Sequence, residues 1–137
     1  MTIVQLDSAR AKRMIQELDL SFIEQRLINV EKCEPEYARE AIACYRKLLT
    51  LQVDYPGQQL VPPATADRAL HAHILYTRQY AESMNAIFGQ FLHHDPGNTS
   101  PEAREFTRKL FLENFGDNID SFALCFVSLE IAERRAA

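Results

Sequence analysis

Apolar side chains recur along most of this chain at the spacing of a helix. Between residues 37 and 51 they lie alternately four and three residues apart, which gathers them on one helical face: Tyr37, Ala41, Cys44, Leu48 and Leu51. No stretch joins the strict alternation of a strand with flanking turn residues. The pattern therefore predicts an all-α protein, a compact bundle of about five to six helices in a single domain.

Capping residues and helix breakers give the expected ends of these helices. Proline in the first turn, as at Pro35 and Pro101, is typical of a helix start, and Gly116 is typical of a helix end. The six expected helices span about residues 8–18, 21–30, 34–54, 64–91, 100–115 and 121–132. Length favours a helix for the last segment, although three of its apolar residues alternate as in a strand: Phe122, Leu124 and Phe126. We expect residues 1–33 to form an N-terminal helical arm and residues 34–137 to form the core bundle.

Composition and charge narrow the class of protein. Apolar residues make up 47% of the 137-residue chain and charged residues 25%, as in ordinary globular domains. A formal net charge of −4 lacks the positive field that nucleic-acid binding uses. The chain shows no secretory signal pattern and no apolar run of the roughly 20 residues of a membrane span. We therefore predict a soluble, cytoplasmic protein that binds neither nucleic acid nor membrane.

The three cysteines, Cys33, Cys44 and Cys125, are odd in number and show no C-x-x-C spacing. Reduced thiols of the cytosol fit this usage better than a disulfide framework or a structural zinc site. Cys44 and Cys125 fall in apolar helical patterns, so we interpret them as small core residues rather than nucleophiles.

All four histidines lie between residues 68 and 97, in two close pairs. His71 and His73 are two residues apart and point about 200° away from each other on a helix, so they cannot chelate one ion together. His71 shares a face with Asp67, four residues earlier. That pair is either a carboxylate that orients a basic imidazole or a surface ion pair. His73 lies on the apolar stripe with Tyr80, where a core histidine bonded to Thr77, a tyrosine or a carbonyl is the alternative to a ligand.

The second pair lies far from the first if the helix is unbroken. At a rise of 1.5 Å per residue, His93 would lie roughly 30 Å from His71. One site using all four histidines then requires an interruption of the helix or an antiparallel dimer, whereas two smaller sites remain open. His93, His94 and Asp95 could hold a metal with ligands from another helix, or cap the end of their own.

One run of the chain carries a family pattern. Between Tyr45 and Pro96 the sequence combines Asp-x-x-x-H-x-H-I-L with F-G and H-H-x-P. It resembles the helical region of the glycine-rich domain-containing protein-like family, without that family's glycine-rich tail. The resemblance implies a compact helical domain with no assigned activity, and it favours a functional role for His71 and His73. The chain departs from the family pattern at Leu70, where the family has tryptophan, and at Met84, where it often has cysteine.

Two functions are consistent with the sequence, and neither a reaction nor an enzyme class is indicated by a known catalytic motif. The first is a small helical module that binds a protein partner or a second copy of itself. The alternative is a metal- or histidine-dependent enzyme or ligand-binding protein centred on Asp67, His71 and His73. For that alternative, Tyr45, Tyr80 and Glu40 are candidate partners in the site, zinc or iron is the candidate ion, and the candidate metal ligands are His71, His73, His93 and His94.

Overall fold

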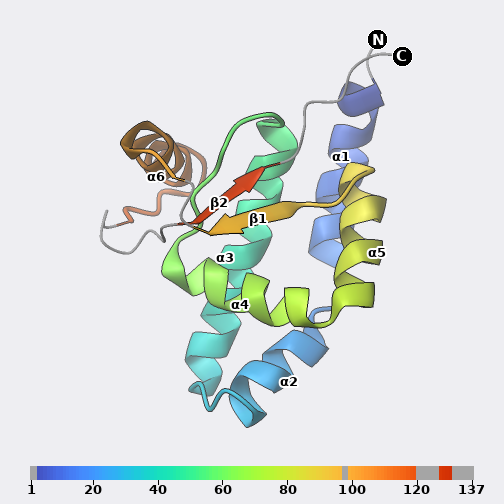
Figure 1. Cartoon of the computed structure of the whole chain (residues 1–137), viewed down its shortest axis with the longest axis vertical. Coiled ribbons are helices and arrows are strands. Elements are labelled where there is room, and N and C mark those ends of the chain that lie inside the picture. Colours follow the sequence, from blue (N-terminus) through green and yellow to red (C-terminus); the bar gives the residue numbers. More distant parts are fainter. Residues whose placement is uncertain (1–2, 97–98, 120–126, 131–137) are drawn as a thin grey trace.

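The computed structural model describes residues 3–96, 99–119 and 127–130. Within these residues the chain forms six helices and one small sheet (Figure 1), which confirms the predicted all-α, single-domain fold. The elements are α1 (Ile3–Glu17), α2 (Ser21–Asn29), α3 (Pro35–Asp54), α4 (Ala64–Leu75), α5 (Thr77–Phe88), β1 (His93–Pro96), α6 (Pro101–Phe115) and β2 (Val127–Glu130).

Helix α3 forms the centre of the fold and packs against α1, α2 and α4. On its apolar face Ala41, Leu48 and Leu51 are completely buried and Tyr37 and Cys44 are partly buried, in line with the four-and-three spacing. Helices α1 and α2, the expected N-terminal arm, contribute side chains to the same core, including Ile15, Leu20, Ile23 and Leu27. Helices α1 and α2 therefore pack into the core with the rest of the bundle.

Local capping signals set several helix ends where the sequence predicts them. The Ser100 hydroxyl accepts a hydrogen bond from the Ala103 N–H at 3.1 Å at the start of α6. Gly116 ends α6 with φ of +72°, a left-handed conformation that glycine adopts without a Cβ penalty. At the start of α2, the Asp19 carboxylate accepts a hydrogen bond from the Ser21 N–H at 3.0 Å.

The predicted single helix over residues 64–91 is wrong, because the structure divides it into α4 and α5. The chain leaves helical geometry at Tyr76, with φ −89° and ψ 70°, and α5 continues in a different direction (Figure 1). The Tyr76 ring packs edge-on against Phe22 of α2, with 5.0 Å between ring centroids. The Arg26 guanidinium lies 5.9 Å from the centroid of the Tyr76 ring. Packing against α2 therefore holds a corner that no proline or glycine marks in the sequence.

The predicted helix over residues 121–132 is also wrong where the structure describes it. Residues 127–130 form strand β2, which pairs antiparallel with β1, with His94 opposite Leu129. The remainder of that predicted helix, including Cys125 and the three alternating apolar residues, lies outside the described residues. In the described part of the chain, no helix combines the length and apolar character needed to cross a bilayer.

Candidate metal centre

Three side chains with metal-binding atoms converge between α4 and β1. His94 Nε2 lies 3.1 Å from Asp67 Oδ1, and His71 Nε2 lies 3.7 Å from Asp67 Oδ2. The two imidazole rings approach with 4.7 Å between centroids. One ligand atom from each of the three residues lies within 4.8 Å of the other two.

The fold assembles this cluster from two separate segments. Asp67 and His71 are four residues apart on α4 and share a face, as helical spacing predicts. The corner at Tyr76 turns the chain into α5, and after α5 ends at Gly89 the chain returns as β1 toward α4 (Figure 1). Successive strand residues face opposite sides, so His94 turns toward α4 while His93 is exposed. The separation of roughly 30 Å expected between the two histidine pairs is therefore wrong, because it assumed an unbroken helix.

The three side chains of the cluster differ in their exposure to solvent. The side chains of Asp67 and His94 are 15% and 11% exposed, whereas that of His71 is 58% exposed. A carboxylate this far removed from water requires a cationic or hydrogen-bonding partner. In the cluster, the His94 imidazole is that partner when its Nε2 carries a proton.

Two contacts hold β1 in this position. The buried Tyr80 hydroxyl donates a hydrogen bond to the Leu92 carbonyl at 2.6 Å, two residues before His94. Strand β2 then pairs with β1 along residues 93–96. The segment that carries His94 is thus held by a hydrogen bond at Leu92 and by strand pairing along residues 93–96.

His73 lies away from the cluster, in the core. It is completely buried, and its Nδ1 lies 2.7 Å from the Tyr45 hydroxyl, so the prediction of a core histidine bonded to a tyrosine is confirmed. Its Nε2 has no hydrogen-bond partner among the described residues. Burial lowers the pKa of His73 to about 4, which keeps the ring neutral at pH 7. The sequence made His73 a candidate metal ligand, but the structure does not place it in the cluster of Asp67, His71 and His94.

The remaining predicted site residues divide between core and surface. Tyr45 and Tyr80 are buried, both rings pack edge-on against His73, and burial raises the pKa of each phenol. His93 packs against Phe91 on the outer side of β1, and Glu40 is exposed on α3. Burial raises the pKa of the Cys44 thiol to about 11, which fits the expected role as a core residue rather than a nucleophile. The structure brings none of these residues to the cluster.

Sequence reasoning named Asp67, His71 and His94 as candidates but did not bring His94 to the other two. Two local signals in the sequence point to elements that position His94. Gly89 takes a left-handed conformation at the end of α5, with φ of +72°, and glycine after an apolar helical segment is a stop signal. Residues 127–130 read Val-Ser-Leu-Glu, an apolar and polar alternation that favours a strand.

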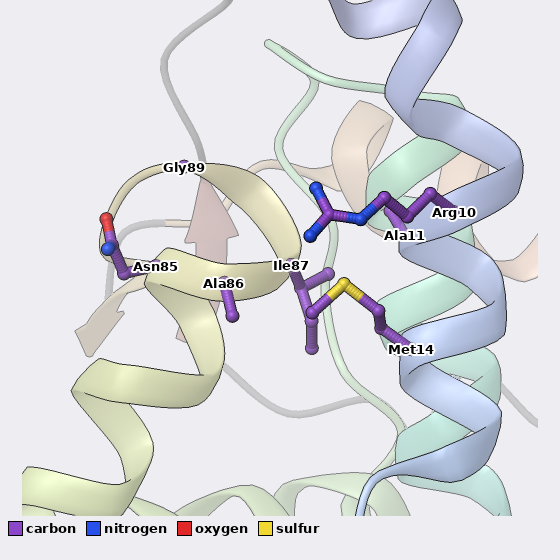
Figure 2. Close-up of a pocket in the computed structure, with 7 residues that line it drawn as sticks. All are labelled: Arg10, Ala11, Met14, Asn85, Ala86, Ile87 and Gly89. Carbon is purple, nitrogen blue, oxygen red and sulfur yellow. The ribbon is translucent and has the colours of Figure 1, made fainter.

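A pocket of about 170 Å³ lies elsewhere, between α1 and the end of α5. Figure 2 shows the Arg10 side chain extending from α1 toward the last turn of α5. The full lining consists of Arg10, Ala11, Met14, Asn85, Ala86, Ile87 and Gly89. This pocket contains none of the predicted site residues, so the histidine and aspartate cluster is a separate feature.

Comparisons with protein-family models, curated proteins and solved structures find no match to this chain. The resemblance to the glycine-rich domain-containing protein-like family stays a prediction from its residues.

Proposed function

We propose that this protein binds a divalent transition-metal ion through Asp67, His71 and His94. The observation that carries the proposal is the convergence of the three side chains, whose ligand atoms lie within 4.8 Å of one another although they come from α4 and β1. Two imidazole nitrogens and one carboxylate oxygen form a donor set that suits zinc or iron.

The distances within the cluster support this proposal. Ligand atoms at 2.0–2.2 Å from one ion lie roughly 3.0–3.5 Å from one another in tetrahedral or octahedral geometry. The contacts of Asp67 with His94 at 3.1 Å and with His71 at 3.7 Å are close to these values. The two contacts use different oxygens of Asp67, and one ligand atom from each residue lies within 4.8 Å of the other two, so side-chain rotations would have to draw the donors together around an ion.

Three protein ligands leave part of the coordination sphere free. A four-coordinate zinc ion would keep one position for water, and a six-coordinate iron ion would keep three for water or substrate. The His71 side chain is 58% exposed, so solvent would reach an ion held beside it. A bound water there would have its pKa lowered by the ion, which is the starting point for hydrolytic or acid-base chemistry.

Partner binding, the other function expected from the sequence, has less support from the described surface. Val30 and Leu75 are the most exposed large apolar residues, at 60% and 61%. Neither residue takes part in the candidate metal cluster, and binding of a protein partner or a second copy stays a prediction.

The test is elemental analysis of untagged protein together with zinc titration of two variants. We expect one ion per chain in the wild type and loss of most zinc affinity in Asp67→Asn, because the neutral amide is a poor ligand. Asp95→Asn is the matched control, since Asp95 is exposed on β1 next to His94. Absence of saturable zinc, iron or nickel binding by the wild type would overturn the proposal, as would equal binding by both variants.

A further inference from the structure

The buried aromatic residues beside the cluster have no place in the proposed metal site, although they contact both segments that carry its ligands. Tyr80 on α5 is 1% exposed, and its ring lies 5.1 Å from His73 and 5.2 Å from Phe91, measured between centroids. His73 follows the ligand His71 by two residues, and Phe91 precedes the ligand His94 by three. Tyr80 thus spans the gap between the two segments.

We propose that Tyr80 is a positioning residue for the metal ligand His94, an inference that rests on the proposed metal-binding function. The carrying contact is the hydrogen bond that the Tyr80 hydroxyl donates to the Leu92 carbonyl at 2.6 Å. Leu92 is completely buried, and it directly precedes His93, where β1 begins. Through this bond α5 sets where β1 starts, and therefore where the His94 ring meets Asp67.

Tyr80 is itself held in place by its neighbours. His73 packs against one side of its ring at an interplanar angle of 88°, and Phe91 packs against it at 79°. The buried Tyr80 phenol stays protonated over the ordinary pH range, because burial raises its pKa. Its hydroxyl therefore remains a donor for the Leu92 carbonyl under all conditions in which metal binding is measured.

A single hydrogen bond at this point has a measurable effect because metal coordination tolerates little displacement. Ligand distances vary by only about 0.2 Å around their preferred values, and loss of an outer-shell partner typically lowers metal affinity about 10- to 100-fold. Removal of the Tyr80 hydroxyl leaves the buried Leu92 carbonyl without this donor, so the segment shifts to regain one. We expect the affinity for zinc to fall about tenfold.

The experiment compares Tyr80→Phe with Tyr45→Phe in the full chain, since each variant deletes one buried phenol hydroxyl and keeps the ring. Zinc affinity is measured by competition with a chelator, the Co²⁺ absorption spectrum reports ligand geometry, and urea unfolding reports stability.

We expect Tyr80→Phe to bind zinc about tenfold more weakly with altered Co²⁺ bands. Tyr45→Phe should lose comparable stability and keep its zinc affinity within about twofold, because its hydroxyl contacts His73 and not the β1 segment. Replacement of Tyr80 by p-aminophenylalanine restores a donor and should restore affinity, which also covers the case in which Tyr80→Phe does not fold.

Several outcomes would overturn the positioning role while leaving the metal site intact. These are wild-type zinc affinity in Tyr80→Phe, an equal loss of affinity in the two phenylalanine variants, and no rescue by the amine. If the wild type binds no metal, the proposed function fails and the positioning role fails with it. The wild-type titration therefore separates the two proposals.

Discussion

His71 and His73 are two residues apart and have opposite environments. The side chain of His71 is 58% exposed beside Asp67, whereas His73 is completely buried against Tyr45. Helical geometry accounts for the difference, because a separation of two residues turns the side chains to opposite faces of α4. The H-x-H pattern thus combines one candidate metal ligand with one core residue that supports its surroundings.

Burial of His73 as a neutral ring makes the metal-free protein sensitive to mild acid. Its pKa is about 4 in the folded protein, against an ordinary value of 6.5. The unfolded chain therefore binds more protons between these values, and stability is lost as the pH falls from 6.5 toward 4. We expect a loss of about 3 kcal/mol from this group over that window.

Urea unfolding at several pH values in the presence of a chelator measures this loss. His73→Phe should be less stable than the wild type at pH 7, because Tyr45 loses its partner, but its stability should change much less between pH 6.5 and pH 4. Tyr45→Phe keeps the titrating ring and should retain the pH dependence. Parallel pH profiles for the wild type and His73→Phe would contradict this explanation.

At the scale of elements, the candidate site depends on a corner and a strand pair. The corner at Tyr76 brings β1 back to α4, and β2 pairs with β1 from a part of the chain more than 30 residues later. A metal ion held by Asp67, His71 and His94 would tie β1 to α4. Because β2 pairs with β1, the ion would also favour the docked position of β2.

Hydrogen exchange of the backbone amides tests this coupling. Saturating zinc should slow exchange in β1 and in β2, although no residue of β2 belongs to the cluster. Helix α6 contributes no ligand, so its amides provide the internal control. Slower exchange confined to α4, with β2 unchanged, would show that the ion does not stabilise the strand pair.

The elements that the sequence predicted well are those with local signals. Pro35 and Pro101 mark helix starts, and Gly116 marks a helix end, because first-turn proline and left-handed glycine act within one turn. The corner at Tyr76 has no such signal. Its φ and ψ are accessible to any L-residue, and contacts with Phe22 and Arg26 hold it. Strand β2 depends on a partner far away in the sequence, so its four residues carry only a weak local pattern.

The part of the site on α4 was predictable from the sequence, whereas the part on β1 was not. Helical spacing correctly placed Asp67 and His71 on one face and separated His71 from His73. It could not bring His94 to them, because that contact follows from the corner and the strand pair. Residue types identified the candidate ligands, and tertiary structure selected three of them.

At the scale of the whole molecule, one core supports both segments of the candidate site. Buried residues of α1 to α5 form a continuous apolar cluster that also includes Leu92, just before β1. The candidate metal ligands are partly exposed and lie on segments that this core anchors, which is what a preorganised site requires. A bound ion would stabilise the folded state in proportion to its concentration and affinity.

The most direct test of metal binding is isothermal titration of zinc into the wild type, His94→Ala and His93→Ala. The two histidines are neighbours on β1, but His94 faces Asp67 and His93 faces away. We predict one zinc site in the wild type, a similar site in His93→Ala, and affinity reduced at least about a hundredfold in His94→Ala, since loss of a ligand exceeds loss of an outer-shell partner. Equal affinity in the two variants, or no zinc binding by the wild type, would contradict the assignment of Asp67, His71 and His94 as a metal centre.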